Sequence, residues 1–164
     1  MLNVEIGGGN APRMPKFAQV DIVKHACTTH VAPAWDLPFD TGTVDTIFTR
    51  HMLEHLYPVQ AHATLDEWAR VLCKGGQAIA IVPDLAYHAR QLLDPTRMSS
   101  RIPDKTNLEH ALAGFYGWAG GHMEHKWGYI GASLLDLFSR HGYVDCRLAE
   151  PASVGDLHIV ARRG

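Results

Sequence analysis

The sequence predicts a single α/β domain, residues 1–164, built on a mainly parallel β-sheet, and three observations support this prediction. Short β-branched and aromatic runs alternate with segments of helical periodicity. A glycine run follows the first apolar run, Leu2–Ile6. Two further runs, 143–148 and 157–162, come after the last helical segment and predict a hairpin with an antiparallel strand at the sheet edge. Alternation of this kind also leads us to expect helices on both faces of the sheet.

The composition and net charge of the chain argue against several kinds of binding partner and of protein class. The 164 residues are 46% hydrophobic and 20% charged, as in ordinary globular proteins, and the formal net charge is -2. This balance supplies no basic field, so nucleic acid is not expected as a partner. No apolar stretch reaches the ~18 residues of a membrane span, and we expect a cytoplasmic protein. The three cysteines form no C-x-x-C pair, which argues against a disulfide framework or a Cys-rich zinc site.

The individual elements follow from periodicity and from Gly, Pro and capping residues. We expect strands at 2–6, 17–22, 44–49, 77–82, 143–148 and 157–162, and a weak strand at 26–31. We expect helices at 59–73, 84–93, 107–114 and 133–141, the first of them stopped by a Gly-Gly pair and the second and third capped by Asp84 and Thr106.

The first crossover connection is short. Only seven residues separate Gly9 from Phe17, and they include Pro12 and Pro15. A parallel crossover normally needs a dozen or more residues, usually with a helix. The first helix is therefore expected to be missing or reduced to about one turn, which disfavours a dinucleotide that needs a helix N-terminus for its pyrophosphate.

A histidine-rich segment, HMLEH, follows the central strand and looks like the start of a helix. On a helix, His51 and His55 would share one face and could bind zinc, with Glu54 as base and a third ligand from His122 or His125. A zinc peptidase sets this motif inside a helix of a different fold, whereas here it follows a buried strand. We assign no metal ligand from the sequence and leave open whether these histidines bind a metal.

Several motifs in a fixed order resemble one known family. They are E-x-G-x-G from Glu5, Asp21 at the end of the second strand, the pair Asp36-Leu37, HMLEHL from His51, LDEWARVLCKGG from Leu65, IVPD from Ile81, and GHMEHKWGY from Gly121. This order resembles class I S-adenosylmethionine-dependent methyltransferases, in particular the type-11-like branch, with a shortened first crossover. The resemblance implies a Rossmann-like fold and S-adenosylmethionine as cofactor.

The resemblance also implies roles for the glycine run. Gly7, Gly8 and Gly9 would let the backbone approach the methionine part of the cofactor. Glu5 would anchor this loop or a bridging water.

Further cofactor contacts are implied by the later motifs. Asp21 would accept hydrogen bonds from the ribose hydroxyls. Asp36 would face the adenine amino group, with Leu37 against the ring, and His51 and Met52 would border the sulfonium.

The irregular segment 114–128 is rich in Gly, His and aromatic residues and is typical of a substrate loop. His51, His122 and His125 are the candidate catalytic residues, since a histidine can accept a proton from a hydroxyl or amine near neutral pH.

Three functions follow. The first is methyl transfer to a small-molecule or glycan-like acceptor, by a chain that could also form a homo-oligomer. The second is a non-catalytic or partner-dependent binding module with the same fold, which the short first crossover favours. The third is a zinc hydrolase that uses HMLEH.

Overall fold

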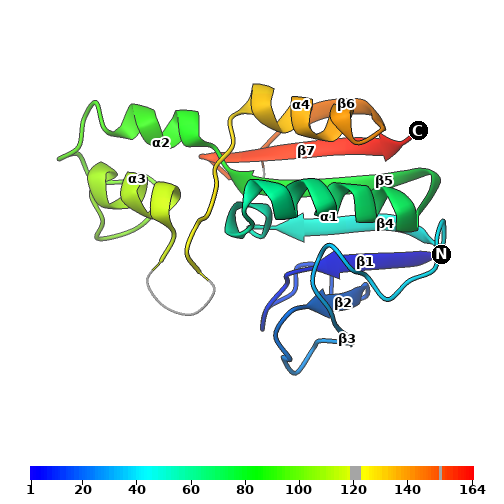
Figure 1. Ribbon diagram of the computed structural model, residues 1–164. Coiled ribbons are helices and arrows are strands. Elements are labelled where there is room, and N and C mark those ends of the chain that lie inside the picture. Colours follow the sequence, from blue (N-terminus) through cyan, green and yellow to red (C-terminus); the bar gives the residue numbers. More distant parts are fainter. Residues whose placement is uncertain (119–122, 152) are drawn as a thin grey trace.

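The computed structural model describes residues 1–118, 123–151 and 153–164, and within these residues seven strands form one sheet (Figure 1). The strand order is β3-β2-β1-β4-β5-β7-β6. Strands β1 to β5 are parallel, and β7 is antiparallel to both β5 and β6. The mainly parallel sheet is confirmed, and its antiparallel strand belongs to the hairpin at the edge, with β6 outermost.

The bounds of the elements agree with most of the expected ranges. The strands are β1 (Leu2–Ile6), β2 (Ala18–Asp21), β3 (His30–Val31), β4 (Val44–Arg50), β5 (Leu72–Pro83), β6 (Tyr143–Ala149) and β7 (Asp156–Arg163). The helices are α1 (Pro58–Val71), α2 (Leu85–Gln91), α3 (Asn107–Tyr116) and α4 (Gly131–Arg140), with one 3-10 turn, η1 (Leu53–His55). Asp84 caps α2 and Thr106 caps α3, as expected.

Helix α1 and strand β5 join without a loop. The helix ends at Val71, and the next residue, Leu72, is already extended and pairs with Val44. The expected stop at the Gly-Gly pair is therefore wrong. Gly75 and Gly76 lie within β5, where a shift in the strand register marks a bend.

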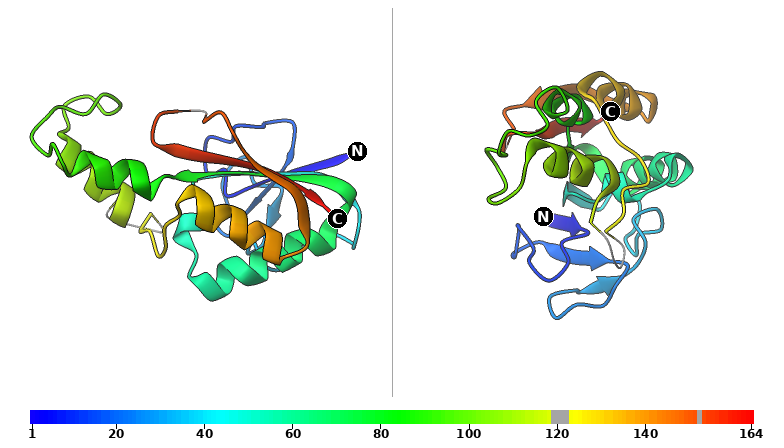
Figure 2. Two further views of the ribbon diagram at one scale, coloured as in Figure 1. Left: turned by 90° about the horizontal axis from the view of Figure 1, so that it is seen from above. Right: turned by 90° about the vertical axis from the view of Figure 1, so that its left-hand side faces the viewer.

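Helices α1 and α4 pack on the same face of the sheet (Figures 1 and 2). Large buried side chains on these helices, such as Leu65, Trp68 and Phe138, cover an apolar layer that includes Ile47 and Ile159. The expectation of helices on both faces is wrong for the described residues, because no helix covers the opposite face. Right-handed crossovers would place helices there only between β1 and β2 or between β2 and β3, and neither connection contains one.

A buried carboxylate holds the β1–β2 connection in place of a helix. Glu5 is 2% exposed, and its oxygens accept hydrogen bonds from the backbone amides of Arg13 (2.8 Å) and Met14 (2.7 Å). The Gln19 side-chain amide donates to the same carboxylate at 3.2 Å. The shortened first crossover is thus confirmed, and Glu5 fixes the path of its loop.

The segment beyond the carboxyl end of β5 extends the molecule to one side, where α2 and α3 pack together (Figure 1). The chain then returns to η1, where the backbone amides of Lys126 and Trp127 both donate to the Glu54 carbonyl, at 2.8 and 3.1 Å. Every described helix falls short of the length and apolar character that a membrane crossing requires.

Candidate active site

A cleft of about 700 Å³ opens at the carboxyl ends of β1, β2 and β4. Ligands of open α/β sheets bind in this position, where neighbouring connections leave the sheet in opposite directions. The cleft is lined chiefly by the residues after β1, the end of β2, the segment after β3 and the start of the β4–α1 connection: Gly7, Gly9, Asp21, Ala32, Pro33, Trp35, His51, Met52, His55 and Tyr57 among others.

The glycine run has a different task at each position. Gly7 has φ +73°, and a Cβ there would lie 2.6 Å from Cγ of Met52, so the backbone and this side chain are in direct contact. Gly8 lies outside the cleft wall and faces Gln19. Gly9 has φ +58°, and no atom lies within 4 Å of the position that its Cβ would take. Gly7 is thus packed, while Gly9 leaves open space on the cleft side.

Asp21 connects the glycine loop to the end of β2. Its Oδ2 accepts from the Gly9 amide at 3.1 Å and its Oδ1 from the Val23 amide at 2.9 Å, and His25 lies at ion-pair distance. A carboxylate oxygen can accept two hydrogen bonds, so each oxygen retains capacity for a ligand hydroxyl. Asp21 therefore has the position and the free acceptor sites that a ribose contact requires.

Asp36 and Leu37 lie outside the cleft wall. Leu37 is buried in the core at 4% exposure, and its amide donates to Glu67 Oε1 of α1 at 2.7 Å. Asp36 is exposed. Anchoring of Leu37 beneath α1 leaves the residues before it, Pro33 and Trp35, to form this part of the wall.

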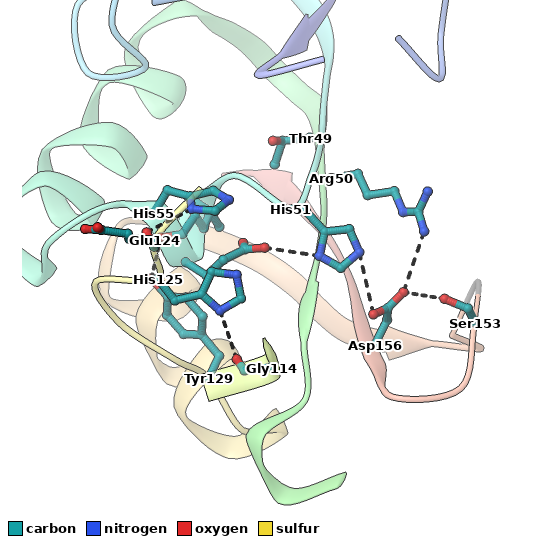
Figure 3. A network of polar contacts seen from close by, with 12 residues as sticks. Thr49, Arg50, His51, His55, Gly114, Glu124, His125, Tyr129, Ser153 and Asp156 are labelled. Carbon is teal, nitrogen blue, oxygen red and sulfur yellow. Dashed lines mark hydrogen bonds and ion pairs between the residues drawn. The ribbon is translucent and has the colours of Figure 1, made fainter. Parts of the chain in front are cut away.

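His51 leaves β4 with φ +52°, a left-handed conformation that interrupts any helix. The expected helix start is wrong, because only the η1 turn precedes α1. Both ring nitrogens face carboxylates: Nδ1 lies 3.1 Å from Glu54 Oε1, and Nε2 lies 3.7 Å from Asp156 Oδ1 (Figure 3). Burial disfavours the charged ring, but these polar contacts outweigh it and raise the pKa of His51 to about 9. Near neutral pH, His51 is therefore a cation that holds both protons.

Asp156, the first residue of β7, is the functional-site neighbour that the sequence analysis missed. Burial alone would raise the pKa of this carboxyl, but contacts with His51, Ser153 and Arg101 hold it well below its usual range. Arg101 lies 3.0 Å from Oδ1, and Arg50 lies 4.0 Å from Oδ2. No local motif announces Asp156, because its partners come from β4 and from a loop far away in the sequence.

His55 and His125 face each other with ring centroids 5.0 Å apart. Nδ1 of His55 is 3.0 Å from the Glu124 carbonyl, and Nδ1 of His125 is 2.9 Å from the Gly114 carbonyl (Figure 3). Because a carbonyl can only accept, both Nδ1 atoms carry a proton, which in a neutral ring leaves the lone pair on Nε2. Burial lowers the pKa of His125, which favours this neutral form.

A second pocket, of about 380 Å³, lies on the other side of these histidines. It is lined mainly by β7, α2, α3 and the returning segment, with His51, Glu54, His55, His88, Arg101, His110, Trp118, Met123, His125 and Asp156 among its residues. The two cavities share His51, His55 and Met123. His122, the remaining sequence-based candidate, lies outside the described residues.

The helical zinc arrangement that HMLEH would allow does not form, because His51 does not share a helix face with His55. The ligand atoms that do converge belong to Glu54, His55 and His125, which lie within 4.8 Å of one another.

Comparisons with known proteins agree with this architecture. Residues 6–80 match a family model described as a methyltransferase domain. No curated protein matches the chain. A solved S-adenosylmethionine-dependent methyltransferase from Methanosarcina mazei has a TM-score of 0.64 at 14% identity, covering 98% of this chain and 91% of that one.

Two further solved structures are similar over nearly the whole chain. One, from Thermotoga maritima, is described as a possible histamine N-methyltransferase; its TM-score is 0.63 at 15% identity, covering 99% of this chain and 82% of that one. The other is 1,6-didemethyltoxoflavin-N1-methyltransferase from Burkholderia thailandensis with bound 1,6-didemethyltoxoflavin and S-adenosylhomocysteine; its TM-score is 0.64 at 14% identity, covering 98% of this chain and 70% of that one. Identities of this size indicate a shared fold. Residues 6–80 therefore match the sequence pattern of a methyltransferase domain, and the full chain has the fold of solved S-adenosylmethionine-dependent methyltransferases.

Proposed function

We propose that the protein transfers a methyl group from S-adenosylmethionine to a small-molecule or glycan-like acceptor. The observation that carries this proposal is the shared wall of the two cavities, formed by His51, His55 and Met123. A donor in the larger cleft and an acceptor in the smaller pocket would meet at this wall. Such an arrangement favours transfer, because the largest task of the protein is to align the two reactants.

The larger cleft suits the cofactor. Gly9 offers open space beside a left-handed backbone, Asp21 offers hydrogen-bond acceptors at the lip, and Trp35 provides an apolar surface for a flat ring. Met52, packed against Gly7, lines the same cleft beside His51. The sulfonium of the bound cofactor supplies the activated methyl group.

Methyl transfer also requires that the acceptor lose a proton, and two histidines near the shared wall differ in their suitability to accept it. An acceptor oxygen or nitrogen attacks the methyl carbon, the sulfur–carbon bond breaks with its electron pair left on sulfur, and the acceptor proton must leave. His125 lines the smaller pocket, and its Nε2 is the candidate proton acceptor because Nδ1 donates to the Gly114 carbonyl. Both nitrogens of His51 face carboxylates, so this ring is better suited to hold Glu54 and Asp156 in position than to accept the proton.

Calorimetric titration with S-adenosylhomocysteine tests the proposal, with Asp21→Ala and Asp36→Ala as a matched pair. Loss of the Asp21 carboxylate should weaken binding about 10- to 100-fold, from the ~1.5–3 kcal/mol of a hydrogen bond to a charged group. Asp36→Ala should bind as the wild type does, because Asp36 is exposed outside the cleft wall. Circular dichroism verifies that both variants are folded.

The same titration separates the proposal from its alternative. A wild-type protein that binds neither S-adenosylmethionine nor S-adenosylhomocysteine at millimolar concentration would be a binding module on a methyltransferase fold. Equal weakening by both aspartate variants would instead overturn the assignment of the ribose contact to Asp21.

A further inference from the structure

One carboxylate oxygen of Glu54 has no hydrogen-bond partner among the described residues, although the side chain is only 1% exposed. The other oxygen, Oε1, receives His51 Nδ1 at 3.1 Å. A buried charged oxygen without a partner is costly, and native proteins rarely retain one without a reason such as an ion. Oε2 of Glu54 is therefore the atom from which a ligand site can be inferred.

Two histidines beside this oxygen, His55 and His125, are already oriented by hydrogen bonds to the backbone. His55 and His125 each use Nδ1 to donate to a backbone carbonyl, at 3.0 and 2.9 Å, so Nε2 is the ring nitrogen left to bind a ligand. Metal-binding histidines almost always have this second bond, which fixes the tautomer and the ring orientation.

We propose that Glu54, His55 and His125 bind one divalent metal ion of the zinc class. Their ligand atoms lie within 4.8 Å of one another. Ligands at ~2.0–2.2 Å from one zinc ion can be at most about 4.4 Å apart, so small side-chain rotations would close the site. Two imidazoles and one carboxylate form a ligand set that suits zinc and other borderline divalent ions and leaves a coordination position open.

The backbone around the site is already fixed. The Glu54 carbonyl accepts hydrogen bonds from the amides of Lys126 and Trp127, which holds the segment with His125 against η1. Because these hydrogen bonds already hold the two segments together, a metal ion could bridge them without a change in the backbone. All three ligands line the pocket of about 380 Å³, and the open coordination position would face it.

This placement gives the metal a role that rests on the proposed methyl transfer. An acceptor hydroxyl bound at the open position would be held next to the wall shared with the cofactor cleft, and coordination would lower its pKa. His125 would then act as a ligand, and the coordinated hydroxyl would release its proton to solvent or buffer. Metal binding itself does not depend on methyl transfer.

Titration with zinc in competition with a chromogenic chelator tests the site. We compare the wild-type protein with Glu54→Gln, which keeps the shape of the side chain, and with His125→Gln. His30→Gln is the matched control, because His30 lies in the edge strand β3 and lines neither cavity. Cobalt, as a substitute for zinc, adds a visible absorption spectrum that reports its ligands directly.

The expected result is one equivalent of zinc in the wild type and in His30→Gln. Glu54→Gln and His125→Gln should each weaken binding by more than the ~10- to 100-fold that loss of an outer-shell partner costs, and should alter the cobalt spectrum. Absence of stoichiometric binding, or an unchanged affinity in the pocket-lining variant His125→Gln, would overturn the proposal. Titration of the same samples with S-adenosylhomocysteine reports the cofactor cleft separately, so failure of one proposal is distinguishable from failure of the other.

Discussion

At the scale of single residues, Gly7 is subject to two constraints that can be separated. Its φ of +73° disfavours any side chain, and a Cβ would also collide with Cγ of Met52 at 2.6 Å. Gly42 has the same φ of +73°, but no atom lies within 4 Å of its Cβ position. The two glycines thus share a backbone conformation and differ in the contact with Met52.

We predict that Gly42→Ala loses about 1–2 kcal/mol of unfolding free energy, the cost of a left-handed backbone. Gly7→Ala should lose about 1–3 kcal/mol more, because Met52 must move. Urea denaturation measures both values. In the double variant Gly7→Ala, Met52→Ala the collision is gone, so the two single losses should not add. Equal losses for Gly7→Ala and Gly42→Ala would show that the contact with Met52 carries no energy.

Sequence reasoning located several site residues for a physical reason and failed on others for a different one. Glycines and acids directly after a strand must lie at the sheet's carboxyl edge, so Gly7, Gly9 and Asp21 could be placed in the cleft from their order. Asp156 begins β7, and its contact with His51 depends on how the final hairpin pairs with β5. That pairing is a property of the whole sheet and leaves no local pattern.

At the scale of elements, buried histidines connect α2 and α3. His88 and His110 are each 3% exposed, and their rings lie 5.0 Å apart. Gln91 links them, since its Oε1 accepts from His88 Nδ1 at 3.0 Å and its Nε2 donates to His110 Nδ1 at 2.9 Å. Ser99 also contacts His110 Nδ1 at 2.8 Å. This network requires the His110 ring to be neutral, because its Nδ1 accepts, whereas His88 donates from Nδ1.

Burial lowers the pKa of both histidines, that of His110 to about 4. The charged groups that face the pair act in both directions: Arg101 disfavours protonation, while Asp156 and Asp84 favour it. In an unfolded chain both histidines bind a proton near pH 6.5, whereas in the folded chain His110 resists its proton until about pH 4. The unfolded state thus gains protons first as pH falls, and stability is lost across this window.

We predict that amide protection of α2 and α3 falls between about pH 6.5 and 4, relative to β4 and β5. Hydrogen exchange measured by mass spectrometry, corrected for the intrinsic pH dependence of exchange, follows this loss. His110→Gln should remove most of the pH dependence, because glutamine does not titrate, while His30→Gln should retain it. An identical pH profile in the wild type and His110→Gln would contradict this account.

The spacing of apolar residues predicts that a helix exists but does not fix the residue at which it ends. Apolar spacing predicted α1, and capping chemistry predicted the starts of α2 and α3 at Asp84 and Thr106. The junction at Leu72 was not predictable, because an apolar residue fits equally well as the end of a helix or the first residue of a buried strand. Pairing with Val44 decides the matter.

At the scale of the whole molecule, the two faces of the sheet are unequal. Helices α1 and α4 bury one face, whereas Phe48 and Ile79 on the other face remain partly exposed beside Val160. The sequence predicted a mainly parallel sheet with an antiparallel strand at its edge, and it also indicated that the first crossover lacked room for a helix. The sequence could not indicate that the connection between β2 and β3 also lacks a helix, because residues 22–29 are numerous enough to form a short one.

We predict that the wall shared by the larger cleft and the smaller pocket couples ligand binding in the two cavities. A ligand on either side restricts His51, His55 and Met123, so the second ligand meets side chains whose conformational entropy has already been lost. Such coupling is reciprocal: the factor by which zinc strengthens the binding of S-adenosylhomocysteine must equal the factor by which S-adenosylhomocysteine strengthens the binding of zinc. Calorimetry from both directions measures the two factors, and a factor of one in each would mean that the cavities act independently.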